Sequence, residues 1–188
     1  MNTESLLQLL SQKYFGKYRG VVVSNDDEKK RGRIKVVVPN VMGQQAIWAL
    51  PCVNYAGKNV GLYAIPPVFD GEVSSWDSRT DAGVWVEFEG GDPNFPIWVG
   101  CFWGEGDEQI SAEDAKPSIK FWRTEGVVLR IDDDEGSLTI ETESGAILVI
   151  GPNEIKLDAQ EVNQVANGSK HQLKASGLDV NNGTFTVT

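Results

Sequence analysis

Alternating apolar and polar positions divide the chain into two regions of predicted β-structure with different periods. In the first region, runs rich in β-branched and aromatic residues are separated by turn residues such as Pro39-Asn40 and Gly90-Gly91-Asp92-Pro93. The five predicted strands are Tyr18–Ser24, Arg33–Val38, Ile47–Val53, Val84–Phe88 and Ile97–Phe102. Five short strands in this span are typical of a small closed barrel of the OB type.

The second region, residues 132–188, carries a shorter and degenerate repeat. Pairs of apolar residues alternate with polar ones about every eight positions, and glycines tend to fall between the pairs. The apolar positions are Leu138/Ile140, Ile147/Val149, Ile155/Leu157, Val162, Leu173, Leu178/Val180 and Phe185/Val187. This pattern predicts short strands joined by tight turns.

A single copy of the second region has too little apolar surface to bury a core alone. Each predicted strand offers only two or three modest apolar side chains on one face, and its edges would stay open. We therefore expect three copies to wind into an intertwined trimeric β-helix, each pairing its strand edges with its neighbours. About seven strand spacings of ~4.8 Å would give a stiff needle roughly 35 Å long.

The predicted organisation is all-β with a short helix at the beginning. We expect an N-terminal helix at 1–13, a five-stranded OB-fold barrel at 14–104, a linker leading into the needle at 105–131, and the trimeric β-helix at 132–188. The helix rests on clustered leucines and an acidic first turn, and the linker rests on the acidic, glycine-bearing stretch before Pro117.

Charge argues against nucleic acid and anionic membrane surfaces as stable partners. The net charge is −10, and residues 105–188 carry most of it, with 7 basic against 16 acidic residues. The N-terminus lacks the pattern of a secretory signal, so we expect the chain to be made and folded in the cytoplasm. Cys52 and Cys101 form no CxxC motif, and we expect both to be buried free thiols.

Candidate chemistry is sparse. His171 is the sole histidine and lies far in sequence from either cysteine, so we expect no catalytic residues, no enzyme activity and no cofactor. His171 shares the strand parity of Leu173, and in a trimer three imidazoles could meet near the axis and bind a metal or an anion. Asp132-Asp133-Asp134-Glu135 suits a solvated turn, with a calcium site as the alternative.

Several motifs follow one another in a characteristic order within residues 14–104. They include Gly32-Arg33-Ile34-Lys35-Val36-Val37-Val38-Pro39, Trp48-Ala49-Leu50-Pro51-Cys52 and Gly83-Val84-Trp85-Val86-Glu87-Phe88-Glu89-Gly90-Gly91-Asp92-Pro93. In this order they resemble bacteriophage baseplate assembly protein V and the related spikes of type VI secretion and extracellular contractile injection systems. With this resemblance we expect assembly in the bacterial cytoplasm. The resemblance implies an OB barrel beneath a hub protein, feeding a trimeric needle that punctures a target envelope when a sheath contracts.

The resemblance also implies partners and sites for a central spike in a phage tail baseplate or phage-tail-like particle. The hub would bind at Leu6, Leu7, Leu10, Tyr14 and Tyr18, and a small proline-alanine-alanine-arginine repeat protein would bind the tip at Phe185, Val187 and Thr188. No nucleic acid is expected, and the target membrane is met only transiently during puncture.

One segment departs from the family pattern. Residues Phe69–Ala82 intervene before Gly83-Val84-Trp85-Val86, and a connection of about 14 residues is long for a compact barrel. Its Phe69, Trp76 and Arg79 are candidates for a system-specific contact, and we expect the loop to be peripheral to the fold. A merely tolerated insertion is the alternative.

Two other functions remain open from the sequence. The OB barrel could be a nucleic-acid or glycan binding module with a trimerising acidic tail, because many such barrels bind single strands through aromatics. An envelope-degrading hydrolase is the third possibility. The mass in solution tests the binding module, since a monomeric binder differs from a trimer. A peptidoglycan-release assay tests the hydrolase.

Overall fold

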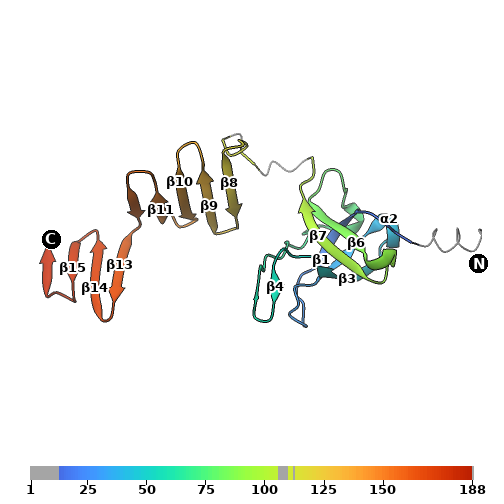
Figure 1. The fold of residues 1–188 in the computed structure, drawn as a ribbon, viewed down its shortest axis with the longest axis horizontal. Helices are drawn as coiled ribbons and strands as arrows, with labels where there is room; N and C mark the ends of the chain where they lie inside the picture. Colours follow the sequence, from blue (N-terminus) through green and yellow to red (C-terminus); the bar gives the residue numbers. More distant parts are fainter. Residues whose placement is uncertain (1–12, 106–109, 112, 188) are drawn as a thin grey trace, which may run out of the picture. The chain divides into compact units, whose positions relative to one another are not determined.

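The chain folds into two compact units, which we describe separately. The computed structural model describes residues 13–105, 110–111 and 113–187, with the side chains of 186 and 187 left aside. Contacts divide the chain into Met1–Gln109 and Ile110–Thr188 (Figure 1). The predicted helix at 1–13 falls almost entirely outside the described residues.

The first unit contains a closed five-stranded barrel in the order β1-β2-β3-β7-β6. Neighbouring strands are antiparallel except β3 and β7, where the parallel pairs Leu50–Ile97 and Pro51–Trp98 close the barrel. The strands are β1 (Tyr18–Ser24), β2 (Ile34–Val37), β3 (Ala46–Pro51), β6 (Gly83–Phe88) and β7 (Pro96–Phe102). All five predicted strands are confirmed, as is the predominantly β fold with an OB-like barrel.

Short elements fill the connections of the barrel. Helix α2 (Pro39–Met42) begins at a proline, whose fixed backbone angle suits the first helical turn. A small hairpin of β4 (Ala56–Gly57) and β5 (Val60–Gly61) projects after β3. Two 3₁₀ turns, η1 (Val73–Ser75) and η2 (Glu89–Gly91), flank β6.

The barrel core is made of inward-facing aliphatic residues and two aromatic residues. Alternation along β6 buries Val84, Val86 and Phe88, as expected for a strand with one wet face. The core members are Val22, Ile34, Val36, Val38, Ala49, Val84, Val86, Phe88 and Trp98. The indole Nε1 of Trp98 donates to the Gly32 carbonyl at 3.2 Å, so the one polar atom of this side chain is satisfied.

A buried ion pair fixes the connection between β1 and β2. The carboxylate of Asp27 accepts backbone N–H groups of Lys29, Arg31 and Arg33 at 2.8–3.3 Å, and the Arg33 guanidinium at 2.5–3.0 Å. Arg33 also stacks on Trp48, 4.9 Å from the ring centroid. The Arg33 side chain, helped by these backbone donors, holds the pKa of Asp27 well below its usual range.

Acid should therefore weaken the barrel through Asp27. Because the folded state lowers this pKa, Asp27 stabilises the fold fully above the unfolded pKa near 4, and the contribution is lost as pH falls below about 4. Asp27→Asn should remove most of this pH dependence and lower the melting temperature at pH 7. Thermal melts between pH 2.5 and 7 measure both effects, and the neighbouring exposed Asp26→Asn is the matched control; equal behaviour of the two variants would contradict this role.

The second unit begins with a five-stranded antiparallel sheet in the order β12-β11-β10-β9-β8. Its strands are β8 (Ile119–Arg123), β9 (Val127–Asp132), β10 (Ser137–Thr142), β11 (Ile147–Ile150) and β12 (Ile155–Asp158). Regular strands thus start at Ile119, inside the segment that the sequence suggested as a linker. Lys and Arg residues interrupt the apolar alternation in β8 and β9, so the sequence pattern does not predict these two strands.

A four-stranded sheet follows in the order β13-β14-β15-β16. Its strands are β13 (Glu161–Ala166), β14 (Ser169–Lys174), β15 (Gly177–Val180) and β16 (Phe185–Val187). Asn167-Gly168 forms the tight turn between β13 and β14, with φ of 46° and 92°. This Asn-Gly pair provides the positive backbone angles that a two-residue hairpin turn requires.

Both sheets are meanders in which each strand pairs with the next strand of the same chain. Pairing of strand edges between copies stays a prediction, and it concerns the outer strands β8, β12, β13 and β16, because the inner strands are paired on both edges. Tight turns reverse the chain directly after each strand, so the next strand of the same chain pairs with it before another copy can. A second copy could therefore cover chiefly the faces of these sheets.

Candidate interaction surfaces

The β8–β12 sheet has one face formed almost entirely by aliphatic side chains. In an antiparallel ladder, directly paired residues point to the same face, and the pairings align Leu129, Ile140, Leu148 and Leu157 in one row. The second row is Ile131, Leu138, Ile150 and Ile155. We call these eight residues the aliphatic face.

Much of the aliphatic face is open to solvent within one chain. Ile155 is 71% exposed and Leu157 is 52% exposed, and Trp122, which pairs with Leu129 on the same face, is 53% exposed. A contiguous apolar patch of this kind marks an interaction site on a soluble protein. The opposite face is mixed: Arg130, Asp132 and Lys156 lie there together with apolar residues of the same strands, among them Val128, Ile147 and Val149.

The register corrects one part of the repeat that the sequence suggested. Ile147 and Val149 pair with Glu141 and Thr139, so both point away from the aliphatic face, and Leu148 and Ile150 take their place on it. The run Ile147-Leu148-Val149-Ile150 is apolar at all four positions, so alternation alone cannot fix its phase.

The β13–β16 sheet places His171 on its more apolar face. His171 pairs with Gln164 on one side and Val180 on the other, and Leu173 lies two residues along the same strand. The parity expected from the sequence therefore holds. Among the described residues of one chain, no group of three or more His, Cys, Asp and Glu side chains could hold a metal ion. An axial ligand role for His171 stays a prediction that depends on a trimer.

The predicted tip residues lie on or beside β16, the outermost strand of its sheet. Phe185 pairs with Val180 and is 58% exposed, and Val187 pairs with Leu178 through its backbone. Thr188 and the side chain of Val187 lie outside the described residues. Tip binding at these positions stays a prediction.

Two of the predicted hub contacts are engaged within the barrel itself. Tyr14 and Tyr18 stack against each other and against Phe88, with ring centroids 5.6–6.1 Å apart. The backbone N–H of Tyr14 donates to Gly91 at 2.9 Å, which anchors the start of the barrel segment. Leu6, Leu7 and Leu10 lie outside the described residues.

The loop Phe69–Ala82 is anchored to the barrel rather than peripheral to it. Phe69 N–H donates to the Val22 carbonyl at 3.0 Å, and Glu105 N–H donates to the Arg79 carbonyl at 2.7 Å. Within the loop, the half-buried Trp76 donates its indole N–H to Ala82 at 3.0 Å. Of the three predicted contact residues, Arg79 has the freest side chain, at 80% exposed.

Arg19 is the main side-chain link between this loop and the barrel. Its guanidinium stacks on Trp85 and Phe102, 5.0 and 4.6 Å from the ring centroids, and donates to the Ser78 carbonyl of the loop. One side chain therefore joins β1, β6, β7 and the loop.

We expect Arg19→Ala to loosen the loop and to lower the free energy of unfolding by about 1–3 kcal/mol, because a charged hydrogen bond and two cation–π contacts are lost together. Chemical denaturation measures the loss, and limited proteolysis within residues 69–82 detects the released loop. Arg79→Ala is the matched control, since its exposed side chain should leave both readouts unchanged. Equal stability of the two variants would show that the loop holds without Arg19.

The β4–β5 hairpin and the residues that flank it present exposed apolar side chains. Tyr55, Val60, Leu62 and Tyr63 are 45–74% exposed, and Leu62 N–H donates to the Tyr55 carbonyl at 2.9 Å. The short strands, with Gly57 and Gly61, give too weak an alternation to be recognised in the sequence. The hairpin is a second candidate contact surface of the barrel.

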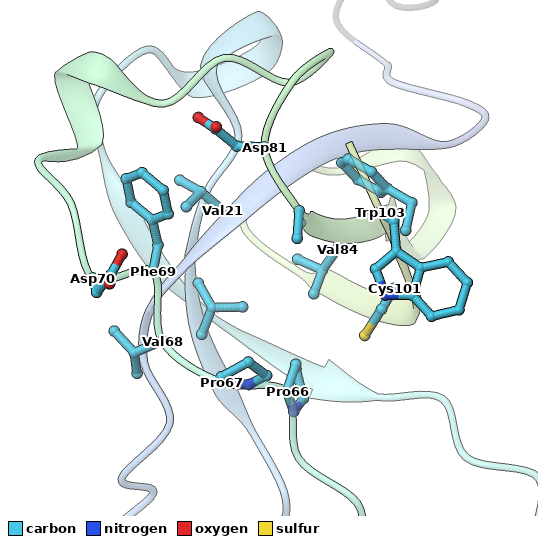
Figure 2. A pocket seen from close by; sticks show the side chains of 14 residues that line it. Val21, Pro66, Pro67, Val68, Phe69, Asp70, Asp81, Val84, Cys101 and Trp103 are labelled. Atoms are coloured by element: carbon cyan, nitrogen blue, oxygen red, sulfur yellow. The ribbon is translucent and has the colours of Figure 1, made fainter. Parts of the chain in front are cut away.

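A cleft opens on the barrel between residues 66–70 and residues 101–103, with a volume of about 450 Å³. Val21 and Val84 form its floor, and Figure 2 shows Asp70 and Asp81 on one side and Cys101 and Trp103 on the other. The cleft is mainly apolar, with two carboxylates as its charged groups.

The reactive groups of the barrel do not form a nucleophilic site. Cys52 and Cys101 are free and exposed, so the expectation of buried thiols was wrong; both lie at or beyond the strand ends, where one face meets solvent. Partial burial of the Cys101 thiol disfavours the thiolate and raises its pKa, the opposite of what an activated thiolate needs. Asp132 accepts N–H groups of Asp134 and Glu135 and pairs with Arg130 at 3.2 Å, which uses its oxygens to form a turn.

Comparisons with known proteins agree with the geometry of the barrel. Residues 18–103 match the family model described as the type VI secretion system/phage-baseplate injector OB domain. The matched range begins at β1 and ends just after β7, so it spans all five barrel strands. No curated protein matches the sequence at a significant level. Within the described residues, no helix is long and apolar enough to cross a membrane. The barrel of this chain is thus similar, over residues 18–103, to the OB domain of type VI secretion and phage-baseplate injectors.

Proposed function

We propose that this protein is the central spike of a contractile injection machine, a non-enzymatic homotrimer that links a hub to a piercing tip and transmits force through a target envelope. The barrel family supplies the setting, because it implies a place in an injection particle. The observation that carries the trimer is the aliphatic face, which one chain leaves largely uncovered. Three copies would bury the aliphatic face around a common axis and leave the opposite face of each β8–β12 sheet in water.

The mass in solution tests the trimer. Light scattering on the full chain should give about 62 kDa, three times the 20.6 kDa of one chain. Because separation would expose the apolar faces of all three chains to water, dissociation on dilution should be slow. A folded monomer at micromolar concentration would sink the proposal.

The barrel end is proposed to bind the hub. Support comes from the exposed apolar side chains of the β4–β5 hairpin, since Tyr14 and Tyr18 are already packed on Phe88. Aromatic side chains that stand exposed on a rigid scaffold are typical anchors at protein interfaces. Tyr63→Ser should weaken co-purification with a hub protein of the same locus without changing the melting temperature. Tyr14→Ser should instead lower the melting temperature, which separates a contact residue from a core residue.

The β13–β16 sheet is proposed to bind a small proline-alanine-alanine-arginine repeat tip protein. Support comes from Phe185, which is 58% exposed on the outermost strand of its sheet. Co-expression with candidate tip proteins should allow pull-down by the full chain and weaker pull-down by a version ending at Gly183. Equal recovery with both would locate the tip contact elsewhere.

A further inference from the structure

The barrel cleft between residues 66–70 and residues 101–103 combines two features that a partner segment could use together. Its floor includes Val21, Val22 and Val84, which are 1–4% exposed, so the base of the cleft is firm core surface. Its walls offer the rings of Pro66 and Pro67 on one side and Trp103, 58% exposed, on the other. Such flat apolar surfaces suit an aliphatic or aromatic side chain.

The charged groups that line the cleft are both carboxylates. Asp70 and Asp81 both lie on the side away from Cys101 and Trp103, apart from each other and with Phe69 between them (Figure 2). One oxygen of Asp81 accepts the Asp77 N–H at 2.8 Å, which fixes its orientation and leaves its other oxygen without a hydrogen bond among the described residues. No lysine or arginine lines the cleft as described. The electrostatic complement of this side is a cation.

The backbone around the cleft also favours an extended occupant. Strand β1 pairs with β6 only from Tyr18 to Gly20, and beyond that point the same edge is met by a single hydrogen bond, from Phe69 N–H to the Val22 carbonyl. The cleft therefore follows a strand edge that separates from its neighbour. Extended peptides bind along such edges and place alternate side chains in adjoining pockets.

We propose that this cleft is a docking site for an extended segment of a partner protein that carries an apolar side chain beside a lysine or arginine. The apolar side chain would lie on the valine floor between the prolines and Trp103, and the basic group would meet Asp81 or Asp70. The proposal concerns the barrel alone and holds whether or not the second unit forms a trimer.

The test uses the full chain labelled with 5-fluorotryptophan and observed by ¹⁹F NMR. The probe is the peptide acetyl-Leu-Arg-Leu-amide at millimolar concentration, which should shift the Trp103 signal, identified with Trp103→Phe. The signal of Trp48, which does not line the cleft and stacks on Arg33, should stay in place. Acetyl-Leu-Glu-Leu-amide and acetyl-Gly-Arg-Gly-amide should each bind at least several-fold more weakly.

Charge variants locate the basic group. Either Asp70→Asn or Asp81→Asn should weaken the probe about threefold, as expected for an exposed ion pair, while Asp26→Asn should leave its affinity unchanged. Asparagine at position 81 keeps an oxygen for the Asp77 N–H, so the fold should be preserved, which a melting curve verifies. The proposal is overturned by an unmoved Trp103 signal, by equal binding of the acidic or glycine peptide, or by unchanged affinity in both variants.

Discussion

Leu148→Asp should break the proposed trimer into monomers or aggregates, which light scattering and cross-linking would detect. Leu148 lies in the middle of the aliphatic face, with Ile140 and Leu157 as its paired neighbours. An unpaired carboxylate buried there would cost roughly 3–5 kcal/mol, and a trimer would contain three of them. The barrel should keep its own unfolding transition, because Leu148 belongs to the other unit.

Val149→Asp is the matched control for this variant. The residue is the next one in sequence and of similar character, but it pairs with Thr139 and Lys156 on the opposite face. A carboxylate beside Lys156 should be well tolerated, so this variant should remain trimeric. The reverse result would place the other face inside the trimer, and trimers from both variants would remove the aliphatic face from the interface.

Ile34→Ala should produce the largest loss of stability within the barrel. Ile34 is fully buried among Val36, Ala49 and Trp98 in the core cluster. Removing three carbon atoms there should cost about 2–4 kcal/mol, through lost burial and the cavity left behind. For a domain of this size the melting temperature should fall by roughly 10 °C or more.

Two further measurements make this prediction specific. Ile34→Val, which removes one carbon, should cost only about 1 kcal/mol. At room temperature the Ile34→Ala variant should still have the mass of a trimer, because the assembly is proposed to depend on residues of the second unit. Equal stability of Ile34→Ala and the unaltered chain would mean that the core relaxes into the space.

The barrel was predictable because its residues follow the alternation rule closely. In β6 the sequence Val84-Trp85-Val86-Glu87-Phe88 changes face at every position, and the structure buries the first, third and fifth. Turn residues bound each strand, so existence and limits could both be derived. The β4–β5 hairpin and strands β8 and β9 were missed, since glycine-rich or charge-bearing strands carry little apolar period.

The interaction surfaces were only partly predictable. Strand parity was sufficient to place His171 with Leu173, but not to orient Ile147-Leu148-Val149-Ile150, where pairing partners decide the face. Tyr14 and Tyr18 were expected at an interface because aromatic residues suit one, yet their stacking on Phe88 depends on the closed barrel. The cleft depends on contacts between residues 66–70 and 101–103, which no local pattern reveals.

The meander topology of the second unit has a consequence for the order in which the molecule assembles. Because every strand of β8–β12 pairs with its neighbour in sequence, loop closure is short and each hairpin can form in microseconds within a single nascent chain. Encounter between copies then joins surfaces that already exist. After dilution from denaturant, the far-ultraviolet circular dichroism of the strands should recover at a rate independent of protein concentration, followed by a slower phase whose rate rises with concentration.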